Sequence, residues 1–300
     1  MTREVVVIGA PVDMGAGRRG VDLGPGAIRY AGLRERLVRL GHQVRDLGNL
    51  VVPLVEQIAP PARDEKLRYL EPLVAINRAL AESVAGVVAA GGFPLMLGGD
   101  HSMALGSIAG SARGRRLGVV WIDAHGDFNT PATTHSGNIH GMPLAALTGR
   151  GHVALTRITG AAPIVRDADI ALVGIRDLDP GERAALHESG VHVFTMHDID
   201  RRGMTAVIDE AIARVAAATD GLHLSLDLDA LDPVAAPGVG TPVPGGLSYR
   251  ETHLACEMLA ETGQLVSMDL VEVNPILDRE NMTAELAVVF ALSALGQKIY

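Results

Sequence analysis

The sequence predicts an α/β fold: a single three-layer domain in which an eight-stranded parallel sheet is covered by helices on both faces. Eight short apolar runs have the length of buried strands, and helical patterns lie between most of them. Of the 300 residues, 48% are hydrophobic but only 3% are aromatic, so the core must consist mainly of Val, Leu, Ile and Ala. This composition is typical of parallel strands that pack beneath alanine-rich helices.

Strands and helices alternate along the chain. The predicted strands are residues 4–8, 43–47, 93–98, 117–122, 169–175, 191–196, 222–228 and 265–271. The predicted helices include residues 25–40, 64–90, 180–189, 205–218, 248–262 and 280–295. Two of them carry a start signal, because Pro25 follows Gly24 and Pro180 follows Asp179, and proline is favoured in the first helical turn. No linker, low-complexity tract or internal repeat divides the chain, so we expect one domain over residues 1–300.

The net charge of −9 argues against nucleic acid or an anionic membrane as a partner, because both require a basic surface. No basic run is longer than Arg115-Arg116 or Arg201-Arg202. The most apolar window, residues 83–99, is interrupted by glycines and by Pro94. We therefore expect a helix end followed by a strand there, and no membrane span.

Cysteine usage indicates a reducing compartment. Cys256 is the only cysteine, which excludes an intrachain disulfide. It lies in the helical pattern 249–262, where an inert, packed thiol is favoured over a reactive one. The first residues lead straight into a strand without the organisation of a signal peptide, so the expected location is cytoplasmic.

Two long loops, residues 9–24 and 123–142, follow strands directly. Ligands of parallel α/β sheets bind beyond the carboxyl ends of the strands, so both loops are expected to overhang one crevice. The first loop contains Gly15-Ala-Gly17-Arg-Arg-Gly20, which satisfies a dinucleotide-binding pattern. However, the next helix begins only near Pro25, so these glycines do not open a helix onto a pyrophosphate.

Three segments at strand ends carry most of the metal-ligand chemistry. They are Gly98-Gly99-Asp100-His101-Ser102, Asp123-Ala-His125-Gly-Asp127 and Ser225-Leu-Asp227-Leu-Asp229-Ala-Leu-Asp232-Pro233. In extended backbone, residues two apart share a face, so Asp123, His125 and Asp127 are expected to point together, as are Asp227 and Asp229.

Each segment taken alone has a structural alternative. His101 could be an ordinary residue in the first turn of a helix capped by Asp100, and for that segment in isolation this interpretation is favoured. Asp227 and Asp229 could equally form an acidic turn. The middle segment has no comparable alternative, because two carboxylates and an imidazole on one face would repel each other or be buried without partners.

Together the segments offer two histidines and four aspartates. This set is too large and too rich in oxygen for one four-coordinate zinc. A pair of harder divalent ions fits better, and manganese is the natural candidate. Two such ions would bridge a water and lower its pKa, so the sequence predicts metal-assisted hydrolysis of an unreactive carbon centre.

In this order, the three segments resemble the three signatures of the ureohydrolase family, which comprises arginases, agmatinases and their relatives. The resemblance extends from Gly15 to Asn274. It implies one α/β domain of the arginase/deacetylase-like kind, with an eight-stranded parallel sheet and two Mn²⁺ ions per chain at its edge. It also implies a homo-oligomer, commonly a trimer or a hexamer.

The resemblance implies a role for each ligand. One Mn²⁺ would be bound by His101, Asp123, Asp127 and Asp227, and the other by Asp123, His125, Asp227 and Asp229. Asp123 and Asp227 would bridge the ions, and Asp127 would also accept a hydrogen bond from the bridging hydroxide. His140 matches a mobile histidine that shuttles protons, a task suited to imidazole; a solvated loop histidine is the alternative.

Glu272, in Val271-Glu-Val-Asn-Pro275, matches the carboxylate that pairs with a substrate guanidinium. Thr241 either lines the same pocket or belongs to a structural turn, with equal weight. The loop from Asn129 to Pro143 resembles the arginase branch of the family and not the agmatinases or formiminoglutamases.

In that branch the substrate is held at its α-amino-acid end. Asn129, Ser136 and Asn138 would bind the α-carboxylate, and Asp179 and Glu182 would receive the α-ammonium group directly or through water. A site built to hydrogen-bond these groups rejects an analogue that lacks them.

The resulting hypothesis is manganese-dependent hydrolysis of L-arginine to L-ornithine and urea. The alternatives are a ureohydrolase for agmatine or guanidinobutyrate, a one-zinc relative of the deacetylases, and a non-catalytic guanidino sensor. No role follows for His135 or Phe128. The remaining histidines are expected to be surface or packed residues: His42, His152, His187, His192, His197, His223 and His253. For His223 a contact with a metal ligand is less favoured than plain packing.

Overall fold

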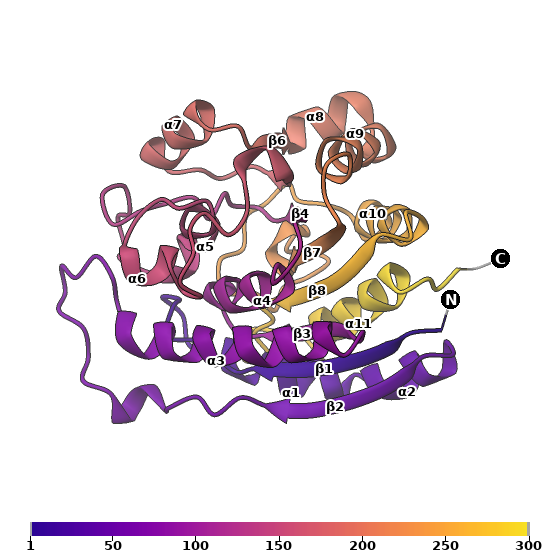
Figure 1. The fold of residues 1–300 in the computed structure, drawn as a ribbon, viewed down its shortest axis with the longest axis horizontal. Coiled ribbons are helices and arrows are strands. Elements are labelled where there is room, and N and C mark those ends of the chain that lie inside the picture. The colour runs from indigo at the N-terminus through magenta and orange to yellow at the C-terminus, as the bar shows by residue number, and fades with distance from the viewer. Residues whose placement is uncertain (1, 299–300) are drawn as a thin grey trace.

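One sheet of eight parallel strands runs through the computed structural model, which describes residues 2–298 (Figure 1). The strand order is β2-β1-β3-β8-β7-β4-β5-β6. The strands are β1 Glu4–Ala10, β2 Gln43–Asn49, β3 Phe93–Gly98, β4 Leu117–Ile122, β5 Ile170–Ile175, β6 His192–Thr195, β7 Gly221–Asp227 and β8 Leu265–Val271. All eight predicted strands are confirmed, as is the parallel sheet.

The helices connect these strands and cover the sheet. They are α1 Gly24–Tyr30, α2 Leu33–Arg39, α3 Leu70–Ala89, α4 Ala104–Ser111, α5 Pro143–Leu147, α6 Val153–Thr156, α7 Pro180–Glu188, α8 Met196–Arg202, α9 Met204–Ala216, α10 Tyr249–Glu261 and α11 Met282–Ala294. The patterns described above do not include α4, α5, α6 or α8. Every residue of α4 is buried, so it has no amphipathic period that could reveal a helix.

Two predicted helix boundaries are wrong. The single helix predicted over 25–40 is two helices, because Gly32 between them adopts a left-handed conformation with φ 82°. The helix predicted from residue 64 begins at Leu70, after Tyr69 with φ 55°. A positive φ interrupts a right-handed helix whatever the hydrophobic pattern around it.

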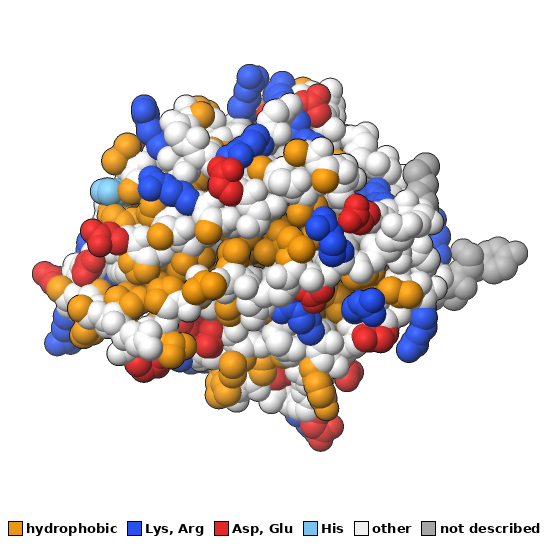
Figure 2. Space-filling model, turned by 60° about the horizontal axis from the view of Figure 1, so that its bottom comes forward, with side chains coloured by type: hydrophobic (Ala, Val, Ile, Leu, Met, Phe, Trp, Pro, Cys, Tyr) orange, Lys and Arg blue, Asp and Glu red, His pale blue; other side chains and the backbone are white. Residues whose placement is uncertain are grey.

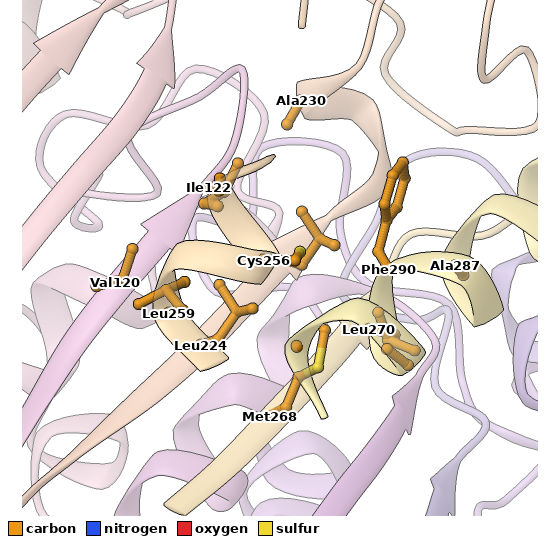
Figure 3. Packing of buried hydrophobic residues seen from close by; sticks show 14 of the residues in the cluster. Val120, Ile122, Leu224, Ala230, Cys256, Leu259, Met268, Leu270, Ala287 and Phe290 are labelled. Carbon is orange, nitrogen blue, oxygen red and sulfur yellow. The ribbon is translucent and has the colours of Figure 1, made fainter. Parts of the chain in front are cut away.

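The two faces of the sheet build two separate cores, as alternation along the strands requires. Val5 and Val7 belong to the core that includes residues of α1, α2, α9, α10 and α11, whereas Val6 and Ile8 belong to the core that includes residues of α3 and α4. Figure 3 shows part of the first core, where Cys256 of α10 and Phe290 of α11 lie over the strands. Cys256 is fully buried, in agreement with a packed thiol.

Helix α3 is long and apolar enough to cross a membrane by length and composition, and half of that stretch is buried. Its Leu73, Ile76 and Leu80 lie in the second core, as expected for a helix that covers a sheet. The interpretation of residues 83–99 as a helix end and a strand is confirmed, since α3 ends at Ala89 and β3 begins at Phe93. Figure 2 shows one face, on which basic and acidic side chains are interspersed.

The strand order decides where the site lies. β3, β8, β7 and β4 are consecutive neighbours, so their carboxyl ends meet at one edge of the sheet (Figure 1). Each of the three ligand-rich segments follows one of these strands, and Glu272 follows the fourth. The segment containing Gly15, Gly17 and Gly20 is a loop before α1 and not the start of a helix, which confirms that the dinucleotide pattern has no structural basis here.

Candidate metal centre and substrate pocket

Three carboxylates surround the imidazole of His101. Its Nδ1 atom lies 3.2 Å from Asp123 Oδ2, 3.1 Å from Asp127 Oδ2 and 3.0 Å from Asp227 Oδ2. His101, Asp123 and Asp227 are almost completely buried. The structure therefore brings together the four residues predicted for one metal ion, and three of them already form a group of ligating atoms close enough to hold a cation.

A second group shares Asp123. His125 Nδ1 lies 3.4 Å from Asp123 Oδ1 and 3.2 Å from Asp229 Oδ2. These three residues form the other group of atoms that could hold a metal ion. We call His101–Asp123–Asp227 the first triad and His125–Asp123–Asp229 the second triad. Because one carboxylate belongs to both, ions in the two triads would lie side by side.

The local geometry that produces this convergence differs from the extended backbone expected. β4 ends at Ile122, and Asp127 has φ 48°, so the segment from Asp123 to Asp127 is a turn and not a strand. Asp229 likewise lies in a short 3₁₀ turn, Leu228–Ala230, after β7. An extended backbone is therefore the wrong reason for the convergence, although the side chains of Asp123 and Asp229 do meet at His125.

Contacts behind the triads orient the ligating atoms. His101 Nε2 lies 2.8 Å from Ser225 Oγ, and the imidazole stacks on Trp121 at a centroid distance of 4.0 Å. Trp121 Nε1 donates to Asp123 Oδ2 at 2.9 Å, and the backbone amide of His125 donates to Asp123 Oδ1 at 2.7 Å. If Nε2 donates to Ser225, the lone pair of His101 Nδ1 faces the carboxylates, as a metal ligand requires.

The ligand cluster is better suited to bind divalent cations than to be neutralised by protonation. His101 Nδ1 is buried and makes no hydrogen bond of acceptable geometry, although three carboxylate oxygens lie near it. Burial and the neighbouring Asp229 and Asp123 charges raise the pKa of Asp227 well above its ordinary value. Burial and Asp123 raise the pKa of Asp127 to about 6. Carboxylates crowded in this way are normally found paired or bound to metal.

Glu272 joins the metal centre to His140. Its Oε1 atom accepts hydrogen bonds from the backbone amide of His101 at 2.9 Å and from His140 Nδ1 at 3.1 Å. Among residues 2–298, its buried Oε2 atom has no hydrogen-bond partner. Glu272 adopts φ 63°, a conformation that is rare for this residue type and that turns the carboxylate back over the site.

His140 is held in place and charged. Burial alone would lower its pKa, but the hydrogen bond to Glu272 and the charges of Glu272, Asp100 and Asp127 raise the pKa to about 9. Its backbone amide donates to Gly15 O at 3.1 Å, which links it to the first long loop. These contacts argue against the alternative of a freely solvated loop histidine.

A cavity adjoins both triads, and all six residues predicted to bind the substrate line it. Its volume is about 150 Å³, and the predicted residues among its lining are Asn129, Ser136, Asn138, Asp179, Glu182 and Thr241. It continues into a second cavity of about 370 Å³ lined by Glu272 and Gly240. A larger cavity of about 680 Å³ under α7 contains none of the predicted site residues.

Hydrogen bonds connect polar side chains that line the smaller cavity. Asn129 Nδ2 donates to Asp179 Oδ2 at 3.0 Å, and Thr241 Oγ1 donates to Asp229 Oδ2 at 2.9 Å. Thr241 therefore contacts a metal-ligand candidate and is more than a turn residue. Ser136 is exposed and Asn138 half-buried, so both are accessible to a ligand.

Glu182 connects the two substrate-binding segments. Its Oε1 atom accepts from the backbone amide of Phe128 at 2.8 Å, and its Oε2 atom accepts from that of Asp179 at 3.3 Å. Burial raises the pKa of Glu182 to about 8, against the effect of the hydrogen bond from Phe128. The side chain of Phe128 is fully buried in the second core, and that of His135 is exposed, with Nε2 4.0 Å from Asp179 Oδ1.

Several neighbours of the predicted ligands have contacts that the sequence did not predict. Asp100 is both the cap of the turn that carries His101, through the amide of Ser102, and an anchor for the first long loop, through the amide of Gly15. The helix-cap interpretation of this segment and the metal-ligand interpretation are thus compatible. The sequence assigned no role to Arg176 or Ser225, because their partners are distant in the chain.

His223 is packed inside the sheet, as favoured, and it is also hydrogen-bonded there. It is fully buried, and its ring nitrogens lie 2.8 Å from Ser267 Oγ and 3.0 Å from Asp269 Oδ2. These contacts satisfy both nitrogens without a metal-ligand candidate. His223 therefore belongs to a polar network between β7 and β8, which a strand pattern alone does not reveal.

Known proteins resemble this chain over its whole length. The sequence model of the arginase family matches residues 3–296. The arginase of Brevibacillus brevis is 54% identical over 300 residues, which cover all of both chains. The solved structure of Bacillus caldovelox arginase superposes with a TM-score of 0.96 at 52% identity over all of both chains. Entamoeba histolytica arginase in complex with L-ornithine gives a TM-score of 0.90 at 32% identity over 99% of each chain.

Proposed function

This chain belongs to the arginase family, and on that premise we propose that it hydrolyses L-arginine to L-ornithine and urea. The observation that carries the proposal is the pairing of two metal-ligand triads with an adjoining cavity lined by Asn129, Ser136, Asn138 and Asp179. The triads suit hydrolysis, and the cavity suits the charged end of an α-amino acid.

The metal centre would hold two Mn²⁺ ions. The first would take His101, Asp123, Asp127 and Asp227, and the second would take Asp123, His125, Asp227 and Asp229. When bound, the pair would lower the pKa of a shared water and so supply a nucleophile near neutral pH. A donor set of imidazole nitrogens and carboxylate oxygens suits manganese better than a single zinc.

Glu272 and Asp127 would orient the reactants. The unpartnered Oε2 atom of Glu272 can accept a hydrogen bond from the substrate guanidinium, which stays protonated at physiological pH. Asp127 would accept a hydrogen bond from the attacking water and fix its direction. Both contacts place the guanidinium carbon and the nucleophile together, which is a large part of catalysis.

His140 would deliver the proton that the leaving amine needs. Its Nδ1 atom is engaged with Glu272, so Nε2 is the nitrogen that can donate to the leaving amine or exchange with bulk water. A pKa of about 9 keeps the imidazole protonated at neutral pH, as a general acid requires.

The α-amino-acid end would bind on the loop and at the start of α7. Asn129, Ser136 and Asn138 would hold the α-carboxylate. Both carboxylate oxygens of Glu182 already accept backbone amides, so we assign the direct contact with the α-ammonium to Asp179. Glu182 would hold the two segments at a fixed separation.

The test is urea release by manganese-loaded protein from L-arginine, agmatine and guanidinobutyrate. We expect L-arginine to give the highest kcat/KM by far, because the other two compounds leave the socket for the α-amino-acid end incompletely filled. Faster turnover of agmatine would assign a different ureohydrolase, and no urea from any substrate would revive the guanidino sensor. Metal analysis of the same sample should find two manganese ions per chain; one zinc per chain would contradict the proposed centre.

We also propose a cytoplasmic homo-oligomer, a trimer or a hexamer. The buried lone cysteine and the family resemblance support these two points. Light scattering of the purified protein would measure its mass directly, and a monomer would contradict the proposed assembly.

A further inference from the structure

Arg176 joins three segments of the site. It follows β5 directly, and its backbone amide donates to Ala124 O at 2.9 Å, between Asp123 and His125. Its guanidinium lies against main-chain carbonyl oxygens from two further segments and from β5 itself. These acceptors are Gly174 at 3.4 Å, Asp229 at 2.7 Å, Ala230 at 2.9 Å, Leu231 at 3.2 Å and Val243 at 2.8 Å.

The pattern is unusual for a half-buried arginine. Within residues 2–298, every hydrogen bond from its guanidinium goes to a carbonyl and none to a carboxylate. Arginine normally receives the planar, two-oxygen partner that a carboxylate offers. Here the rigid fork joins the segment 229–231 to the loop at Val243, in addition to the isolated bridge between Leu231 and Leu247.

Those segments carry the second triad. Ala124 lies between Asp123 and His125, and Asp229 is itself one of the carbonyl acceptors. Val243 is two residues from Thr241, whose hydroxyl donates to Asp229 Oδ2. The first triad has other supports, because His101 contacts Ser225 and Asp227 ends β7.

The loop at Gly246 packs closely against one side of the guanidinium. A Cβ atom built on Gly246 would lie 2.5 Å from Arg176 Nη2 and 2.6 Å from the amide nitrogen of Asp232. Only a residue without a side chain fits there, so the loop closes tightly around the arginine. The arginine cation also lies close enough to feel the charges of Asp229 and Asp123, which oppose the lowering of its pKa by burial.

We propose that Arg176 is a positioning residue that holds the second triad in shape for its metal ion, while the first triad is held independently of it. This inference rests on the two-metal centre of the proposed function. In this role, Arg176 would keep Asp229 and Thr241 in place relative to Asp123 and His125. Residues behind the ligands typically change metal affinity or activity by about 10- to 100-fold when they are replaced.

The test is a calorimetric titration of Mn²⁺ into metal-stripped wild-type protein, Arg176→Met and Arg176→Lys. Wild type should bind two ions. In Arg176→Met one of the two events should stay within about threefold, and the other should lose about 10- to 100-fold in affinity. Arg176→Lys should be intermediate, because an ammonium can donate to several carbonyls but lacks the planar fork.

Activity adds a second measurement. The kcat of Arg176→Met should be low at limiting Mn²⁺ and recover when Mn²⁺ is raised, with a nearly unchanged KM for L-arginine. A purely structural role would lower the thermal midpoint without changing the ratio of the two affinities. Arg183→Met is the matched control, since Arg183 is exposed, lines the same 680 Å³ cavity and should titrate like wild type.

Two results would overturn the assignment: unchanged affinity for both ions in Arg176→Met, or equal weakening of both. If Arg176→Met does not fold, Arg176→Gln takes its place, and the same comparison of the two events decides. Binding of fewer than two Mn²⁺ ions by wild type would overturn the two-metal centre together with this inference. Two ions in wild type with no selective loss in the variant would overturn the inference alone.

Discussion

The metal-ligand cluster and the loop after it are neighbours in sequence but are held in different ways. Asp123 is completely buried, and its carboxylate accepts from the Trp121 indole and the His125 amide. Ser136, only thirteen positions later, is exposed on a turn. The cluster is built on the ends of three strands, β3, β4 and β7. The loop is held by its own short-range hydrogen bonds and by contacts with other loops, such as those from Lys66 to Thr134 and from Asn129 to Asp179.

This difference separates the chemistry from its selectivity. A buried cluster on strand ends tolerates little change, because each donor is constrained by several partners. A surface loop can change its polar groups without disturbing the sheet. We infer that the sheet edge specifies hydrolysis and that the loop specifies the substrate. Variants that affect one region and not the other would sharpen this division.

The largest effect is expected from Asp127→Asn, at the boundary between the two regions. The variant removes a negative ligand and the acceptor for the attacking water, so both metal retention and rate should fall. If the metal ions stabilise the transition state less well by several kcal/mol, kcat should decrease about 10³-fold. Metal analysis and a urea assay measure the two effects. Asp209→Asn on the exposed side of α9 is the control, and an unaltered metal content in Asp127→Asn would contradict the ligand assignment.

A smaller and more selective effect is expected from His140→Asn. General acid–base catalysis typically contributes about 10²- to 10⁴-fold, and an external proton donor can replace part of it, so we expect the low end of that range for kcat. Metal content should remain that of wild type, because His140 contacts Glu272 and is not placed as a ligand. The exposed His187→Asn serves as the control. Full activity in His140→Asn would show that the proton-shuttle assignment is wrong.

Asn138→Ala tests the loop by itself. Removing one hydrogen bond to a charged ligand costs about 1.5–3 kcal/mol, so the KM for L-arginine should rise about tenfold or more. Its kcat and its metal content should change little. Agmatine has no α-carboxylate, so its turnover should be the same in the variant and in wild type. A parallel loss for both substrates would mean that the loop supports the metal centre and not only selectivity.

The stability of the fold should depend on pH through Glu182, the carboxylate that joins the loop to α7. Its pKa rises from an ordinary value of 4.5 to about 8 in the folded chain, chiefly through burial. Between these values the folded state holds the proton more tightly than the unfolded state does. The stability contribution is therefore fully present below about pH 4.5 and is lost as the pH rises towards 8.

In metal-free protein, wild type should lose stability relative to Glu182→Gln over that range, by no more than about 1.4 kcal/mol per pH unit. Glutamine keeps an oxygen that can accept from Phe128, which isolates the effect of the charge. Urea unfolding of both proteins at several pH values measures the difference between their free energies of unfolding. Parallel stability curves for the two proteins would contradict a raised pKa at this carboxyl.

Much of the architecture could be predicted because its signals are local. Apolar runs such as Leu117–Ile122 report buried parallel strands, and the polar residues that follow them report the functional edge of the sheet. The boundary errors have equally local causes. Gly32 and Tyr69 adopt left-handed conformations, which a helical hydrophobic pattern does not predict.

The sequence by itself determined the fold class, the six candidate metal ligands and the polar loop beside them, because these depend on residue type and on spacing along one segment. Only the tertiary structure decided that Asp123 belongs to both triads, that Glu272 contacts His140, and that Arg176 reaches Asp229 and Val243. The contacts of Glu272 and Arg176 join residues from 53 to 132 positions apart. They follow from the strand order, in which β3, β8, β7 and β4 lie side by side, and no pattern within a single segment specifies that order.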